Sequence, residues 1–150
     1  MNDTALATAF RATTYRVLTP SGAFDLRIGR VDAAFDAFLA RQSLLWCPAT
    51  DRDGIAWGIV TAFNPGTPLT DVENESRQHA LEDRLAALRW VHFPACNIAD
   101  DGLWPVERSC LLVGVDEQAV CALAREFGQL AAVGGRRGAA PRLLWIADEN

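Results

Sequence analysis

Five polar residues, each next to an apolar segment, are the side chains of this sequence best suited to bind a ligand or take part in chemistry. They are Asn64, Asn74, Arg77, Glu107 and Gln129. Amides and a guanidinium recognise hydrogen-bonding patterns, and a carboxylate near apolar surface can act as a general acid or base. We therefore treat Glu107 as the one candidate for catalysis and the other four as candidate ligand contacts.

Asn74 is a candidate ligand contact because of its angular position on a helix expected over Asp71–Leu88. At about 100° per residue, Asn74 falls in the middle of the leucine stripe that Leu81 begins. Arg77 and Gln78 fall on the two edges of that stripe. The buried side thus becomes polar near the helix N-terminus, where backbone N–H groups and the helix dipole favour a small polar or anionic ligand.

The same residues also have a purely structural interpretation. Asn74 could hydrogen-bond to the backbone of the loop that starts at Asn64 and Pro65, while Arg77 pairs with Glu73 one turn earlier. A buried polar group needs a partner whether or not a ligand exists. Both interpretations therefore stay open at the level of sequence.

Other reactive side chains do not combine into a site. Ser76, His79 and Asp83 have the types of a nucleophile, a base and an orienting acid, but they fall on the solvated side of the expected helix. Asp100 and Asp101 precede a glycine and predict a turn rather than a cation site. We expect no metal ion and no catalytic triad.

Composition narrows the classes of function. All fourteen basic residues are arginine, which excludes a Schiff-base lysine and the lysine of a P-loop, and we expect no cofactor. The four cysteines form no C-x-x-C pair, so neither a zinc ribbon nor a thioredoxin-like motif is indicated. A net charge of -5 weighs against general nucleic-acid binding.

Length and hydropathy favour one soluble domain. The 150 residues suit a single core, no apolar run is long enough to span a membrane, and the N-terminus lacks the pattern of a secretory signal. We expect a cytoplasmic protein with an arm at residues 1–13 and one α+β domain at residues 14–150.

The elements that must position the candidate residues follow from periodicity and turn signals. We expect strands at Thr14–Leu18, Ala23–Ile28, Ile55–Phe63, Trp90–Cys96, Arg108–Val115, Leu130–Val133 and Arg142–Ile146. Besides the helix at Asp71–Leu88, we expect one from Asp32 to about Gln42 and one from Asp116 to Gly128. Loops are expected at Leu44–Gly54, Asn97–Pro105 and Gly134–Gly138.

From Ile55 onward the order strand, helix, strand, strand, helix, strand is that of a ferredoxin-like (split βαβ) sandwich. An N-terminal β-hairpin and a helix precede it as an extension. The sequence therefore predicts an α+β fold with helices on one face of a mainly antiparallel sheet.

Several of these motifs also resemble a known family. Thr61-Ala62-Phe63-Asn64-Pro65, Glu73-Asn74 at a helix start, Glu107-x-Ser109 before a strand and Phe127-Gly128-Gln129 occur together in this order. The chain is in this respect similar to the bacterial domain-of-unknown-function family 3293, over roughly Tyr15 to Ile146. The resemblance implies no established reaction, cofactor or substrate, but it implies that Asn64, Pro65, Asn74, Glu107 and Gln129 belong to one recurring pattern.

Two functions from different classes follow. The first is a domain that binds a small polar or anionic ligand at the Asn64 loop and the N-terminus of the following helix. The second is a non-catalytic protein–protein interaction module that uses a sheet edge or the surface of Trp46 and Trp104. RNA binding on an open sheet face is a weaker third alternative, because it requires stacking aromatics and a basic field.

Overall fold

The structure is a computed structural model and describes residues 3–46 and 54–146. In chain order the elements are α1 (Asp3–Arg11), β1 (Thr13–Thr19), β2 (Gly22–Leu26), α2 (Ala33–Trp46), β3 (Ala56–Val60), α3 (Asp71–Leu88), β4 (Val91–Ala99), β5 (Glu107–Val113), α4 (Glu117–Glu126), β6 (Ala131–Arg136) and β7 (Arg142–Trp145). Most of the predicted loop at Leu44–Gly54, with Cys47, lies outside the described residues, as does the side chain of Trp46.

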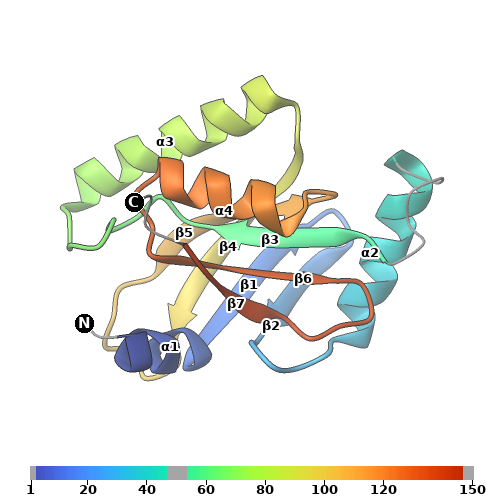
Figure 1. The fold of residues 1–150 in the computed structure, drawn as a ribbon, viewed down its shortest axis with the longest axis horizontal. Coiled ribbons are helices and arrows are strands. Elements are labelled where there is room, and N and C mark those ends of the chain that lie inside the picture. The colour runs from blue at the N-terminus through green and yellow to red at the C-terminus, as the bar shows by residue number, and fades with distance from the viewer. Residues whose placement is uncertain (1–2, 47–53, 147–150) are drawn as a thin grey trace.

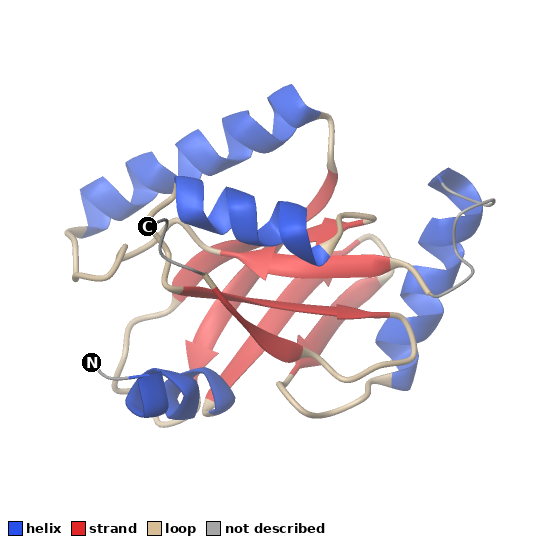
Figure 2. Cartoon of the chain, in the orientation of Figure 1, coloured by secondary structure: helices blue, strands red, loops and turns tan. Residues whose placement is uncertain are grey.

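The strands form one seven-stranded sheet with the order β2-β1-β4-β5-β3-β6-β7. Every neighbouring pair is antiparallel. The two predicted hairpins are confirmed, because β1 pairs with β2 and β6 pairs with β7. Together with the helices, this confirms a mixed α+β architecture (Figure 2).

Strand β3 is an interior strand between β5 and β6, as its apolar residues predict. Successive side chains of a strand point to opposite faces of the sheet. Trp57 and Ile59 belong to one buried cluster, whereas Val60 belongs to another. Both faces of β3 are therefore buried, which explains why this segment has no polar residue between Ile55 and Val60.

Helices cover both faces of the sheet, so the prediction that all helices pack on one face is wrong. Phe35 and Phe38 of α2 pack in the same cluster as Trp57, and Phe10 of α1 packs against it. Leu81 of α3 and the buried residues of α4 pack in the cluster of the opposite face. Figure 1 shows α3 and α4 beside one another on one side of the sheet, with α1 and α2 away from them. An apolar stripe predicts that a helix is buried, but it does not specify the face.

Two predicted loops are shorter than expected because neighbouring strands extend the ladder. Strand β4 continues to Ala99, since it pairs with β1 up to Thr13 and with β5 up to Glu107. Strand β6 continues to Arg136, which pairs with Ala56 of β3. The turns that follow β4 and β6 therefore begin later in the chain than the turn-forming residues of the sequence indicate.

The predicted helix starts are confirmed. Thr70 accepts a hydrogen bond from the Glu73 amide, and Glu73 reaches back to the Thr70 amide in a capping box. Asp116 caps α4 through the Ala119 amide, and Asp32 accepts from the Phe35 amide at the start of α2. None of the described helices is long and apolar enough to cross a membrane.

Candidate functional site

Asn64 and Asn74 form a reciprocal pair that joins the end of β3 to the first turn of α3. The Asn64 amide donates to Asn74 Oδ1 at 2.9 Å, and Asn74 Nδ2 donates to Asn64 Oδ1 at 2.9 Å. Asn64 Oδ1 also accepts from the Leu69 amide at 2.8 Å. Asn64 has a positive φ of 46°, a conformation that asparagine tolerates better than most residues. The pair thus fixes the loop that leads into α3.

Glu107 is connected to the same pair from the neighbouring strand. Its Oε1 accepts from Asn64 Nδ2 at 2.7 Å and from Trp104 Nε1 at 3.0 Å. No described residue donates a hydrogen bond to Oε2, and the side chain is half-buried. Two donors therefore orient this carboxylate while its second oxygen remains available.

Arg77 does not pair with Glu73. Its Nε donates to the Ala62 carbonyl at 2.6 Å, and one terminal nitrogen donates to the Phe127 carbonyl. Glu73 instead uses its carboxylate on Thr70, and these hydrogen bonds lower the pKa of Glu73. The guanidinium therefore joins the end of β3 to the end of α4.

Gln129, which follows the C-terminal end of α4, is the last of the five candidate residues. Its Nε2 donates to the Phe63 carbonyl at 3.0 Å. Gly128 precedes it with a φ of 71°, and a Cβ at this position would lie 3.0 Å from Pro65 Cβ. A glycine is therefore needed for α4 to end this close to the loop.

Four of the predicted site residues converge on the segment 62–64, which contains the fifth, Asn64. Arg77 and Gln129 bind its carbonyls at residues 62 and 63, and Asn74 and Glu107 bind Asn64. The structural interpretation of Asn74 as an anchor of the loop is thus confirmed in its hydrogen bonds.

The first turn of α3 already carries two negatively charged side chains. Asp71 and Glu73 both lie there, where acidic side chains interact favourably with the helix dipole. With the half-buried Glu107 nearby, this arrangement makes the neighbourhood less favourable for an added anion than the helix terminus alone suggests.

The polar stripe of α3 extends one turn further than Asn74. Gln78 is only 1% exposed, and its Nε2 donates weakly to Glu82 and to Cys110 Sγ at 3.3 and 3.5 Å. Burial is the main cause that raises the pKa of the Cys110 thiol to about 11, whereas the hydrogen bond from Gln78 opposes this. Cys110 is therefore protonated and inert at neutral pH.

The side chains that sequence reasoning set aside do not form a site either. Ser76, His79 and Asp83 are all exposed on the outer face of α3. Asp100 binds Arg27 and Thr14, and these hydrogen bonds lower its pKa to about 2. Among the described residues, no group of three or more His, Cys, Asp and Glu side chains could hold a metal ion.

Trp104 contacts Glu107, which the sequence does not predict. We considered it only as an exposed aromatic residue, yet its indole N–H orients Glu107. Its position three residues before Glu107 was the available signal. A residue in a loop of unknown path could not be assigned that role from spacing alone.

Residues 60–132 match the model of a family described as Protein of unknown function (DUF3293). The match confirms the resemblance and extends from β3 to β6, so it includes all five candidate residues and leaves out the N-terminal hairpin. No curated protein and no solved structure matches the chain.

Proposed function

We propose that the surface formed by Glu107, Trp104 and the Asn64 loop binds a small polar ligand that donates hydrogen bonds. One observation carries this proposal. Glu107 Oε1 is held by Asn64 and Trp104 at 2.7 and 3.0 Å, while Oε2 has no donor among the described residues. An acceptor oriented in advance binds a donor at a lower entropic cost than a mobile one.

The charges and the apolar surface around Glu107 define the class of ligand. Asp71 and Glu73 disfavour an anion, and the two donors of Arg77 described above are already used on carbonyls. Trp104 is 47% exposed and offers a flat face on which a cationic or planar group can pack. An amine, amide or hydroxyl compound with a small apolar body fits these constraints better than a phosphate or carboxylate.

A thermal-shift screen tests this function. Amino acid amides, polyamines and nucleosides should include a compound that raises the melting temperature, whereas nucleotides and sugar phosphates should not. Glu107→Gln should abolish the shift in melting temperature. It removes the negative charge and the free acceptor oxygen, while a side-chain oxygen still faces Asn64 and Trp104.

Asp25→Asn is the matched control, since it removes one exposed carboxylate from the remote β1–β2 hairpin. It should leave the ligand-dependent shift unchanged. A shift that persists in Glu107→Gln, or that is lost equally in Asp25→Asn, would show that Glu107 is not the acceptor.

A protein–protein interaction module is the second candidate, and one observation favours it. Leu103, Trp104 and Val106 are 86%, 47% and 54% exposed in the connection between β4 and β5. Adjacent exposed apolar side chains are typical of contact surfaces. If no compound raises the melting temperature while a pull-down yields one stoichiometric partner that Leu103→Ser releases, this second function replaces the first.

We also propose that the segment from β3 to β6 forms a ferredoxin-like (split βαβ) unit. The segment from β3 to β6 has the strand order β4-β5-β3-β6 with antiparallel neighbours. This order supports a ferredoxin-like (split βαβ) unit, to which the N-terminal hairpin is added beside β4.

A further inference from the structure

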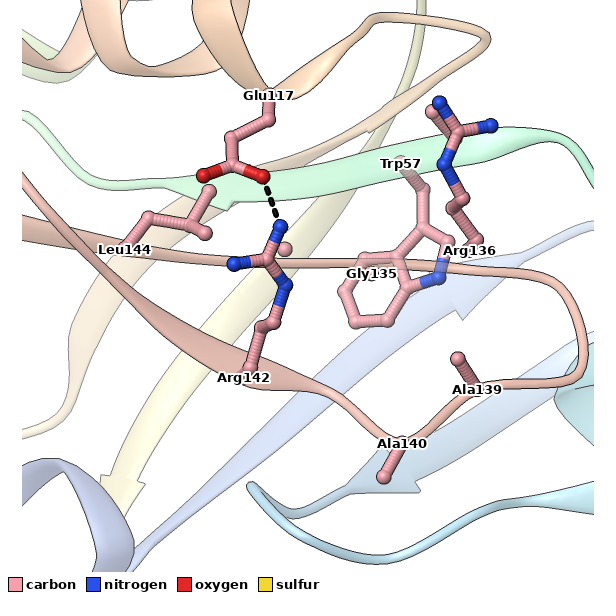
Figure 3. Close-up of a pocket in the computed structure, with 10 residues that line it drawn as sticks. Trp57, Glu117, Gly135, Arg136, Ala139, Ala140, Arg142 and Leu144 are labelled. Carbon is pink, nitrogen blue, oxygen red and sulfur yellow. Dashed lines mark hydrogen bonds and ion pairs between the residues drawn. The ribbon is translucent and has the colours of Figure 1, made fainter.

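A cavity of about 150 Å³ lies beside the β6–β7 hairpin, at the end of β3 opposite to Asn64 (Figure 3). Gly134 and Gly135 of β6 border it together with Trp57 of β3. Arg142 of β7 and Glu117 at the start of α4 contribute charged groups. None of these residues takes part in the network around Asn64.

Two glycines are required for the strand to pass this close to its neighbours. A Cβ on Gly135 would lie 2.9 Å from Trp57 Cζ2, and one on Gly134 would lie 2.7 Å from Leu144 Cδ1. Real side chains do not approach so closely. The indole of Trp57 therefore packs directly against bare backbone at the edge of the cavity.

The indole also brings its N–H group to the edge of the cavity. Trp57 is only 2% exposed, and no described residue accepts a hydrogen bond from its Nε1. This nitrogen lies 3.2 Å from the position of a Cβ on Gly135, a residue that borders the cavity. The ring is fixed by edge-to-face packing on Phe35 at a centroid distance of 5.2 Å. Indole N–H groups inside proteins normally have an acceptor, and a ligand in the cavity could provide one here.

The charge at the cavity is positive on balance. Arg142 contacts Glu117, which accounts for one arginine and the one carboxylate of the lining. Arg136 donates from Nη1 to the Gly54 carbonyl at 2.9 Å, a neutral acceptor, and no carboxylate of the described residues is found paired with it. Figure 3 shows the guanidinium groups of Arg136 and Arg142 on either side of the Trp57 ring.

From these features we propose that the cavity binds a small organic carboxylate. Its oxygens would accept hydrogen bonds from Trp57 Nε1 and from a guanidinium, whose planar fork matches a carboxylate. Its carbon body would contact Ala139, Ala140 and Leu144, which supply the apolar part of the lining. A cavity of about 150 Å³ holds a molecule of roughly benzene's size, which limits the ligand to a short chain or a single ring.

Proton–nitrogen correlation spectra of the full chain test the proposal directly. The indole N–H signal of Trp57 is identified by its loss in Trp57→Phe. Titration with butyrate and benzoate should move that signal downfield in a saturable way, because the N–H gains a charged acceptor. Butyramide and benzamide, which have the same shapes without charge, should not move it.

Substitutions distinguish binding in the cavity from non-specific attraction of anions to the protein surface. Arg136→Gln should weaken carboxylate binding by about tenfold, and Gly135→Ala should abolish it by displacing the indole, with native spectra elsewhere showing that the fold is kept. Arg84→Gln, which removes an exposed arginine from α3, should change nothing. Glu107→Gln should also leave this titration unchanged, so the two proposed sites fail or succeed separately.

Four results would overturn the proposal. One is a Trp57 signal that neither carboxylate moves, and another is equal binding of the neutral amides. The third is a shift by inorganic phosphate as large as that by the carboxylates, and the fourth is equal weakening by Arg84→Gln. Either of the last two would mean that the cavity does not select a carboxylate.

Discussion

At the scale of single residues, Asn74 is both part of a buried helix face and a polar anchor of the preceding loop. It is 4% exposed in the stripe of α3 that packs on the sheet, yet both ends of its amide bond to Asn64. Burial of an amide costs free energy unless its hydrogen bonds are made. Here they are made to a loop that has no other regular structure, so the buried amide defines the loop's conformation.

Asn74→Ala should lower the free energy of unfolding by about 2 kcal/mol, because it leaves the partly buried Asn64 amide without its acceptor and opens a small cavity. Chemical denaturation monitored by circular dichroism measures this change. Ser76→Ala, on the exposed face of the same helix, should stay within about 0.5 kcal/mol of the parent. A loss for Asn74→Ala no larger than that of the control would contradict the anchoring role.

The burial of Asn74 could be predicted because it depends only on helix periodicity and the positions of the leucines. Its partner could be named too, since Asn64 ends the preceding strand. The acceptors of Arg77 could not, because the Ala62 and Phe127 carbonyls come together only when α4 packs beside α3. Contacts within one strand–loop–helix unit follow from spacing, whereas contacts between units require the assembled fold.

At the scale of elements, α4 rests on the sheet through a contact between Val120 and Gly58. A Cβ on Gly58 would lie 2.6 and 2.7 Å from the two Val120 methyl carbons. Gly58 therefore lets the helix approach β3 closely enough for Val120 to be fully buried.

Gly58→Ala should destabilise the protein by about 2 kcal/mol through overpacking, and Val120→Ala should do so by a similar amount through a cavity. The double variant should be less destabilised than the sum by at least about 1 kcal/mol, because the smaller side chain makes room for the new methyl group. Equilibrium unfolding of all four proteins gives this coupling. Additive losses would show that Gly58 is needed for its backbone rather than for the approach of α4.

The existence and order of the elements after Arg11 could be predicted from sequence, whereas their exact extents could not, and α1 was expected only as an arm. The ends of β4 and β6 depend on how far β1 and β3 continue beside them. The face that α2 covers depends on the N-terminal hairpin, because that hairpin widens the sheet and leaves apolar residues such as Tyr15 and Val17 to be covered. These are properties of strand pairing, which local periodicity does not contain.

At the scale of the whole molecule, the sheet separates two buried clusters, one on each face. Cys110 belongs to the cluster under α3 and α4 and is 2% exposed. With a pKa of about 11, about one molecule in a thousand carries its thiolate at pH 8. Reaction of this thiol therefore reports the opening of that entire face.

In native protein at pH 8, a thiol reagent should modify Cys110 far more slowly than the partly exposed Cys96, because thiolate and access are both lacking. Peptide mapping by mass spectrometry after timed labelling distinguishes the cysteines. In increasing denaturant, modification of Cys110 should follow global unfolding measured by circular dichroism. Labelling of Cys110 at a rate close to that of Cys96 in native protein would mean that α3 opens locally.

The pairing of β1 with β4 also has a consequence for synthesis on the ribosome. Val17 of β1 lies opposite Ala95 of β4, so the first hairpin leaves the ribosome long before the strand that completes its inner edge. Nascent chains emerge N-terminus first, and contacts between residues so distant in sequence form late. During that interval an unpaired strand edge is open to other chains. The exposed Arg16 and Asp25 on this hairpin place charge beside that edge, which disfavours its pairing with another copy while β4 is still being made.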